Sequence, residues 1–392
     1  MLPDNERISR SRLALKDAKF DALACALPGN VLLLSGYWPV IGTSIAVFSS
    51  DGGVTLLVPN DEKQLAEGGW ADEVITFSTG SLGKLKSLAE AVEPALKKIG
   101  IRFTNAKIGF ENGPANEPVS YASMNYYGAA IKDLLHSTFP GAWLVPADET
   151  LSRLRAVLTP DEIDRTRNAC SIAADAFAAG STNICEGMAE KEIAAAFWRK
   201  LSLTDGRAGG FTFCMSGENS YEAFAAFQLS GARCVQTGDL ALVHCNSFVN
   251  GFWTDISRTY CIGEPDKKKQ KMYEAVFASL DAAIAAIRPG AAASAVDRAA
   301  REVLTERGFG AEFKHGLGHG VGFDAIDHNA PPRLHPASTD VLETGMVLNV
   351  EPAIYIEGYG GMRHCDMVAV GTRGVEILTD FQRTPAEMVV NK

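Results

Sequence analysis

The sequence predicts two domains, an α/β domain over residues 1–155 and an α+β domain over residues 156–392. A chain of 392 residues exceeds what one ordinary hydrophobic core accommodates, so two cores are expected. Short apolar runs alternate with helical stretches before residue 155, which is the layer pattern of an α/β domain. Helices and β runs also occur after residue 155, and their grouping indicates an α+β domain with an antiparallel sheet.

Five β-like runs lie in the first domain. They are ALACAL (22–27), NVLLLSG (30–36), SIAVFSS (44–50), GVTLLVP (53–59) and AKIGFE (106–111). A helix is expected over residues 82–99. The alternation of such runs with helices continues to about residue 143 and ends before the boundary near residue 155.

The segment TPDE marks the start of the second domain. Thr159 is expected to cap a helix, with Pro160 at the first helical position and Glu162 completing a capping box. This helix should run to about Gly180. Three further helices are expected at residues 189–203, 268–287 and 293–307.

The segment DLALVHCNSFVNGFWTDISRTY predicts a β-hairpin around Asn250-Gly251, a dipeptide suited to a two-residue turn. In that register Asn246 lies opposite Asp255, and His244 lies opposite Ser257, all four on one face. His244 and Asp255 are then diagonal neighbours, about 7 to 8 Å apart at Cα, and can close around an ion. Taken alone, the hairpin favours a simpler interpretation, with a hydrogen-bonded core histidine and a carboxylate near the turn, over a metal site.

Charge and composition limit the possible partners. The formal net charge is −10 and the sequence pI is near 5.3. Binding of nucleic acid needs clustered Lys and Arg, which are not found, so a small molecule or dipeptide is the expected partner. No run of about 18 apolar residues and no secretion signal is recognised, so we expect a cytoplasmic protein without a membrane segment. The eight cysteines show no CxxC spacing and are expected to be mostly buried thiols.

The chemistry is concentrated in the last third of the chain, where six of the seven histidines lie between residues 244 and 364. Three motifs follow the hairpin: KHGLGHGVGF with His315 and His319, VLETGMVLNVEPAI with Glu351, and GGMRHCDMVAVG with Arg363 and Cys365. With these motifs the chain resembles the pita-bread metallopeptidase superfamily, which includes Xaa-Pro dipeptidases, aminopeptidases P and creatinase. The resemblance implies a creatinase-like N-terminal domain and a pita-bread catalytic domain.

The resemblance also implies a set of metal ligands. Family members hold two metal ions with Asp, Asp, His, Glu and Glu, the two Asp lying eleven residues apart. The matching positions here are His244, Asp255, His319, Glu351 and Cys365. Two carboxylates are thus replaced by imidazole and thiolate, softer ligands that favour zinc or iron(II) over manganese. The loss of a bridging carboxylate favours one ion over two. Loss of metal binding altogether, as in the creatinase branch, is the open alternative.

Proton handling departs from the family pattern. A family histidine is replaced by Phe224, and the position seven residues after His319 is Ile326. The nearest histidine is His328, which we expect to contact substrate or act as acid and base, through a two-residue insertion. His315 is expected to support the site, and Arg363 completes the predicted catalytic set. The remaining histidines are assigned to surface or packing, namely His136, His335 and His364.

These observations predict a hydrolase of C–N bonds that resembles Xaa-Pro dipeptidases and aminopeptidases P, with water activated by a metal ion. The first alternative is a metal-independent, creatinase-like hydrolase of a small amide or amidine. The second is an inactive relative that only binds peptides. The resemblance further implies a homodimer.

Overall fold

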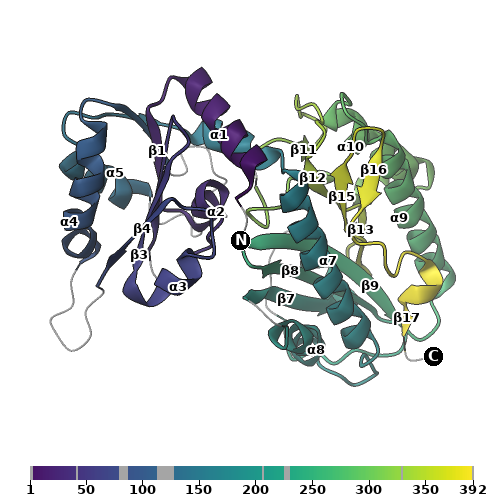
Figure 1. The fold of residues 1–392 in the computed structure, drawn as a ribbon. Coiled ribbons are helices and arrows are strands. Elements are labelled where there is room, and N and C mark those ends of the chain that lie inside the picture. The colour runs from purple at the N-terminus through teal and green to yellow at the C-terminus, as the bar shows by residue number, and fades with distance from the viewer. Residues whose placement is uncertain are drawn as a thin grey trace. The chain divides into compact units, whose positions relative to one another are not determined.

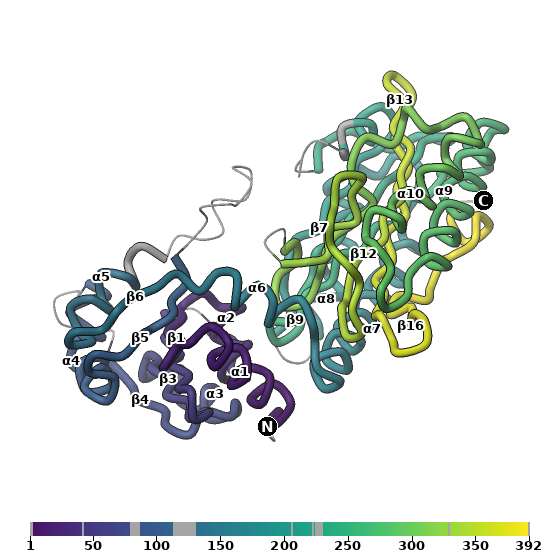
Figure 2. Tube along the Cα trace, turned by 90° about the horizontal axis from the view of Figure 1, so that it is seen from above, coloured from purple at the N-terminus to yellow at the C-terminus, as the bar shows by residue number. Residues whose placement is uncertain are grey.

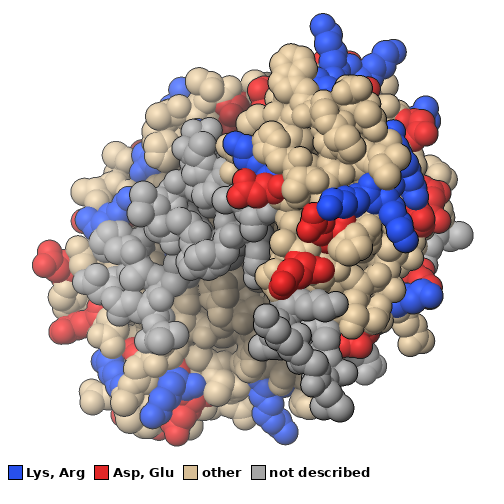
Figure 3. Space-filling model, turned by 90° about the vertical axis from the view of Figure 1, so that its left-hand side faces the viewer, with Lys and Arg blue, Asp and Glu red and all other residues tan. Residues whose placement is uncertain are grey.

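The structure is a computed structural model that describes residues 3–40, 43–78, 87–112, 128–204, 207–224, 230–327 and 330–390 (Figure 1). The chain forms two compact units, Met1–Arg155 and Ala156–Lys392. No helix among these described residues is long and apolar enough to cross a membrane. Acidic and basic side chains are interspersed on the described surface that Figure 3 shows.

A six-stranded mixed sheet, in the order β4-β3-β2-β1-β5-β6, is the centre of the first unit. Its strands are β1 (Ala22–Cys25), β2 (Ile45–Ser49), β3 (Val54–Pro59), β4 (Glu73–Phe77), β5 (Lys107–Phe110) and β6 (Trp143–Pro146). Its helices are α1 (Asn5–Ala18), α2 (Pro28–Ser35), α3 (Lys63–Ala66), α4 (Leu88–Gly100), α5 (Gly128–Thr138) and α6 (Asp148–Ala156), with the 3-10 turns η1 (Asn60–Glu62) and η2 (Ile101–Phe103). In Figure 1, α4 and α5 cover one side of this sheet and α1 and α2 the other.

Four of the five predicted β runs of this unit form strands, and the prediction for NVLLLSG was wrong. Residues 30–35 belong to helix α2, in which Pro28 occupies the first turn and the N–H of Gly36 closes the end on Leu32. A continuous apolar run fits a buried helix as well as a buried strand, and the flanking Pro and Gly were the signals that distinguish them. The expected helix over 82–99 is α4, which begins at Leu88, and residues 82–86 lie outside the described residues.

The second unit has four long helices, and all were predicted to within two residues at each end. They are α7 (Pro160–Ser181), α8 (Glu190–Ser202), α9 (Lys267–Ala286) and α10 (Ala293–Glu306), and the 3-10 turns are η4 (Gly217–Phe224), η5 (Gly310–Glu312) and η6 (Pro385–Met388). The Thr159 side chain accepts from the N–H of Glu162, whose carboxylate accepts from the N–H of Thr159. This capping box satisfies N–H groups that the first helical turn leaves without partners.

The strands of the second unit form several small sheets instead of one continuous sheet. A four-stranded sheet has the order β17-β9-β8-β7, a three-stranded sheet the order β12-β15-β16, and β13-β14 and β10-β11 are pairs. The strands are β7 (Ala208–Ser216), β8 (Leu240–Val249), β9 (Phe252–Ile262), β10 (Gly318–His319), β11 (Arg333–Leu334), β12 (Val347–Val350), β13 (Ala353–Ile356), β14 (Gly360–Arg363), β15 (Asp366–Val370), β16 (Val375–Ile377) and β17 (Val389–Val390). All pairings are antiparallel except that of β17 with β9.

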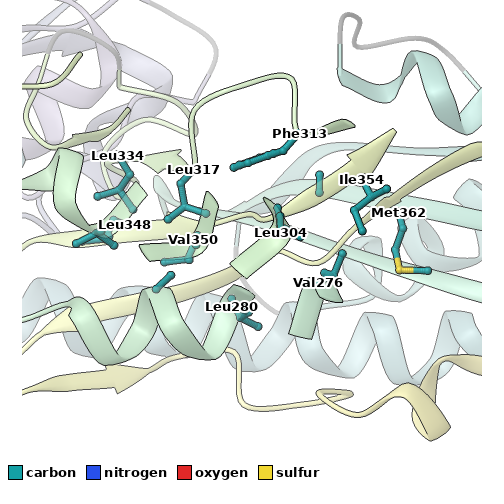
Figure 4. Close-up of a cluster of buried hydrophobic side chains, with 14 of the residues drawn as sticks. Val276, Leu280, Leu304, Phe313, Leu317, Leu334, Leu348, Val350, Ile354 and Met362 are labelled. Atoms are coloured by element: carbon teal, nitrogen blue, oxygen red, sulfur yellow. The ribbon is translucent and has the colours of Figure 1, made fainter. Parts of the chain in front are cut away.

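Strand β8 has a different core on each of its faces. Val243 and Cys245 pack with Phe177 of α7 and Phe197 of α8. Leu242 belongs to a second cluster, with side chains of α9 and α10, which lie next to each other in Figures 1 and 2. Figure 4 shows part of this cluster, including Val276, Leu280, Leu304, Leu348 and Val350. His244 and Asn246 continue the face of Leu242, because side chains alternate along a strand.

Candidate metal centre

Three residues far apart in the chain bring their ligand atoms together. Asp255, Glu351 and Cys365 each offer one oxygen or sulfur atom, and these three atoms lie within 4.8 Å of one another. Asp255 lies in β9, whereas Glu351 follows β12 and Cys365 precedes β15. The pairing of β12 with β15 and the backbone bridge between Ser257 and Cys365 bring these strands together. Three of the five predicted ligands therefore meet at one place.

His319 approaches the same place with a ring orientation that suits a metal ligand. Its Nδ1 lies 2.9 Å from the carbonyl oxygen of Gly320, so Nδ1 carries the proton. Its Nε2 lies 3.5 Å from Oδ2 of Asp255 and 3.3 Å from Nδ2 of Asn349. Ligating histidines commonly donate their other ring N–H to a carbonyl group, which directs the lone pair at the ion. Asn349, two residues before Glu351 on the same strand face, was not predicted.

His244, the fifth predicted ligand, lies in the hairpin and has both ring nitrogens bonded to protein atoms. Nδ1 lies 2.9 Å from an NH2 group of Arg363 and 2.8 Å from Oγ of Ser257, and Nε2 lies 2.5 Å from Oδ1 of Asn246. Because the guanidinium can only donate, Nδ1 accepts and Nε2 carries the proton. Nδ1 also lies 3.7 Å from Oδ1 of Asp255, so the ring borders the cluster of three ligands.

Arg363 places a permanent positive charge beside the carboxylates. Its Nε donates to Oγ of Ser257 at 2.9 Å and lies 3.9 Å from Oε2 of Glu351. Burial alone would lower the pKa of Arg363, but Tyr355, Glu351 and Asp255 hold it above its usual value. The side chain is almost completely buried. Arg363, predicted as a catalytic residue, is thus part of the site.

The surroundings of the ionisable groups in the site move their pKa values apart. Burial alone would raise the pKa of Asp255, but His244, His319 and Arg363 lower it well below its usual range. Burial raises the pKa of Glu351 to about 7, although Arg363 opposes this, and burial lowers the pKa of His244 to about 4. At neutral pH His244 is neutral, and the fixed charge of Arg363 favours the ionised form of Asp255. Two carboxyl groups with such different pKa values are typical of an acid and base pair.

Cys365 is a protonated thiol in the absence of a cation. Its Sγ lies 3.0 Å from the carbonyl oxygen of Asp255, to which it donates. Burial and the neighbouring Asp255 and Glu351 raise its pKa well above the usual value. A bound metal ion would remove this proton and replace the bond with a thiolate ligand. The donor atoms of Asp255, Glu351 and Cys365 are close enough to hold one divalent ion, and Nε2 of His319 faces the same Asp255 carboxylate.

The other predicted catalytic residues have different outcomes. His315 lies near the site, with Nε2 3.1 Å from the hydroxyl of Tyr355 and Nδ1 2.7 Å from the carbonyl oxygen of Gly316. Burial lowers the pKa of His315 to about 4 and raises that of Tyr355 to about 12, so both are neutral hydrogen-bonding groups at pH 7. Tyr355, in EPAIY, was missed by the sequence prediction. His328 lies outside the described residues, and the roles of the predicted site residues stay predictions.

Known proteins resemble this chain over nearly its whole length. Metallopeptidase family M24 matches residues 164–372, and the creatinase/prolidase N-terminal domain matches residues 7–157. An Xaa-Pro dipeptidase of Pyrococcus furiosus is 29% identical over 379 residues, which is 96% of this chain and 99% of the relative. The solved prolidase of Pyrococcus horikoshii covers 96% of this chain and 98% of its own, with a TM-score of 0.76 and 26% identity.

A solved prolidase of Pyrococcus furiosus gives a TM-score of 0.74, with 28% identity, and covers 94% of this chain and 99% of its own. The predicted fold class and family are confirmed by these matches, and the chain is a hydrolase. Because the family match spans more than half of the sequence, the chain belongs to metallopeptidase family M24 and carries a creatinase/prolidase-type N-terminal domain.

Proposed function

We propose that this protein is a metal-dependent hydrolase that cleaves the C–N bond of an Xaa-Pro dipeptide or a similar small amide. The observation that carries the proposal is the meeting of Asp255, Glu351 and Cys365, with Nε2 of His319 facing Asp255. The Pyrococcus relatives named Xaa-Pro dipeptidase support the substrate class. Thiolate and imidazole ligands favour zinc or iron(II) over manganese.

A bound divalent ion supplies Lewis-acid chemistry, because it polarises a carbonyl group and lowers the pKa of water from 15.7 toward roughly 7. Hydrolysis joins the water oxygen to the carbonyl carbon, breaks the C–N bond and moves one proton to the leaving nitrogen. His328 is the group that we expect to hold this proton between the two events. Arg363 is the fixed cation that stabilises negative charge developing near Glu351.

One observation favours a metal-free alternative. Arg363 already compensates negative charge at the cluster, and the Cys365 thiol is satisfied by the carbonyl oxygen of Asp255. A creatinase-like hydrolase of a small amide or amidine fits these contacts. Creatine itself is disfavoured, because a guanidinium substrate prefers carboxylate partners and position 365 holds a thiol.

Metal removal distinguishes these functions. The purified protein is dialysed against chelator, reloaded with zinc, iron(II) or manganese, and assayed for amine release from Xaa-Pro dipeptides, amides and amidines. We expect activity to disappear with the metal and to return best with zinc or iron. Full activity in chelator would favour the creatinase-like alternative, and no turnover of any substrate with any metal would favour a peptide-binding protein.

His328 and the oligomeric state complete the proposal. We expect His328→Ala to lower kcat/KM while metal content is unchanged. The reason is that His328 is expected to contact the substrate or transfer a proton, and not to bind the metal ion. His335→Ala is the matched control, since His335 is exposed. Unchanged kcat/KM in His328→Ala would show that His328 takes no part in the reaction.

Sedimentation should show a homodimer. Fractionation of the source cells should place the protein in the cytoplasm.

A further inference from the structure

We infer that Arg363, held by His244 and Ser257, is the second cation of this centre, so that each chain binds one divalent ion and His244 is not its ligand. The inference rests on the proposed metal-dependent function and specifies how many ions that function uses. It reverses the expected ligand role of His244, which becomes a residue that positions Arg363.

The hydrogen bonds of His244 carry the first step. Its Nδ1 lone pair accepts from Arg363, and its Nε2 donates to Oδ1 of Asn246 at 2.5 Å. Ligation through either nitrogen requires one of these buried partners to lose its bond. A hydrogen bond to a charged group is stronger than one between neutral groups, and a buried donor left without an acceptor is destabilising. His319 differs, because its proton is on the nitrogen that faces Gly320 and its other nitrogen faces the ligand Asp255. The partner of that second nitrogen is the neutral amide of Asn349, 3.3 Å away, so ligation there displaces no charged group.

Arg363 is anchored at both its backbone and its side chain. Its N–H donates to Oγ1 of Thr259 at 3.0 Å, and the Thr259 hydroxyl donates to its carbonyl oxygen at 2.9 Å. Its Nε is bonded to Ser257, which is paired with His244 across the hairpin. Strand β9 therefore supplies both the ligand Asp255 and the contacts that hold the guanidinium. The Arg363 guanidinium therefore cannot move away without breaking several buried hydrogen bonds.

Charge balance gives the second step. With one ion bound, Asp255, Glu351 and the thiolate of Cys365 carry three negative charges, which one divalent ion and Arg363 neutralise. A second divalent ion would leave two uncompensated positive charges among side chains that are nearly or fully buried. An uncompensated buried charge has a large desolvation penalty even after the protein relaxes around it. The charges of the site are therefore balanced when one divalent ion is bound.

The test counts ions and does not depend on turnover. Apo-protein is reloaded with excess zinc or cobalt(II), passed through a desalting column and analysed for metal per chain. We expect one equivalent, and a near-ultraviolet thiolate-to-cobalt charge-transfer band that is absent in Cys365→Ala. Asn can accept the Arg363 bond in place of Nδ1, so His244→Asn should keep one equivalent and the band, with affinity lowered by no more than about 100-fold.

A double variant tests the role of the guanidinium. His244→Asp with Arg363→Met adds one carboxylate and removes the fixed cation, which leaves four negative charges for two divalent ions. We expect this variant to bind two equivalents and the single variant Arg363→Met to bind one. Circular dichroism checks that each variant is folded.

The outcomes separate this inference from the proposed function. Two equivalents in the wild-type protein, or loss of the ion in folded His244→Asn, would overturn the inference and leave a metal-dependent hydrolase. One equivalent in the folded double variant would overturn the role of Arg363 as a second cation. No metal bound in the wild type, with turnover in chelator, would overturn the proposed function itself.

Discussion

Arg258 in β9 and Asp366 at the start of β15 form a completely buried ion pair, with NH2 of Arg258 2.8 Å from Oδ1 of Asp366. The same guanidinium donates to the carbonyl oxygen of Cys365 at 2.7 Å. Arg258 follows Asp255 by three residues, and Asp366 follows Cys365 directly. The pair therefore joins the two strands that carry Asp255 and Cys365, and it fixes the backbone next to both.

Removal of one partner of this pair should destabilise the second unit strongly. We expect Arg258→Met to lower the free energy of unfolding by about 3 kcal/mol, because removal of one partner of a buried ion pair is strongly destabilising. Nε of Arg383, 2.8 Å from Oδ2 of Asp366, still compensates part of the remaining charge. Urea unfolding measures this loss. Arg167→Ala is the control, since its ion pair with Glu376 is exposed and should contribute about 1 kcal/mol or less. A loss in Arg258→Met no larger than in the control would contradict the prediction.

Truncation of Leu280 tests the core between α9 and the small sheets. Leu280 is fully buried and belongs to the cluster of Figure 4. We expect Leu280→Ala to lower the free energy of unfolding by about 2–5 kcal/mol, because it removes apolar contacts and leaves a cavity. Leu203→Ala, at a position 67% exposed, should change it by about 0.5 kcal/mol or less. Similar losses in both variants would contradict this assignment of the core.

Glu111 should make the stability of the first unit depend on pH. This carboxyl group is buried and accepts from Asn30 and from the N–H groups of Ala26 and Leu27. Burial raises its pKa from 4.5 to about 7, so between these values the folded unit binds more protons than the unfolded chain. The contribution of Glu111 to the free energy of unfolding is therefore present at pH 4.5 and is lost as pH rises to about 7.

Urea unfolding at pH 5 and pH 8, followed in the first unit, tests this dependence against Glu111→Gln. The variant removes the titrating group, so we expect its pH dependence to be weaker than that of the wild type in this window. Other groups titrate equally in both proteins and cancel in the comparison. An equal dependence in the two proteins would exclude Glu111 as its source.

Cys365 should decide which metal the centre prefers. We expect Cys365→Ser to narrow the preference for zinc over manganese, because a hydroxyl replaces a soft thiolate. Competition between the two ions for the apo-protein measures this ratio. Cys234→Ser should leave the ratio unchanged, since Cys234 is exposed and is not among the cluster of three ligands. An unchanged ratio in Cys365→Ser would mean that the thiol does not bind the ion.

Features that depend on near neighbours in the chain could be predicted from the amino-acid sequence. The turn Asn250-Gly251 set the hairpin register, which the structure reproduces with His244 opposite Ser257. The capping box of Thr159 and Glu162 set the start of α7. Turn and capping chemistry act within a few residues, and alternation then assigns every side chain of a paired strand to one face.

Tertiary structure decided the features that depend on distant partners. The motifs identified the cluster of Asp255, Glu351 and Cys365, but only the folded chain shows that the ring of His244 is bonded to Arg363, 119 residues away in the sequence. The run at 30–35 is buried as a helix on all sides, so its own hydrophobic periodicity did not separate a helix from a strand. A motif specifies which atoms are present, whereas ring orientation and protonation follow from the donors and acceptors that other strands bring within reach.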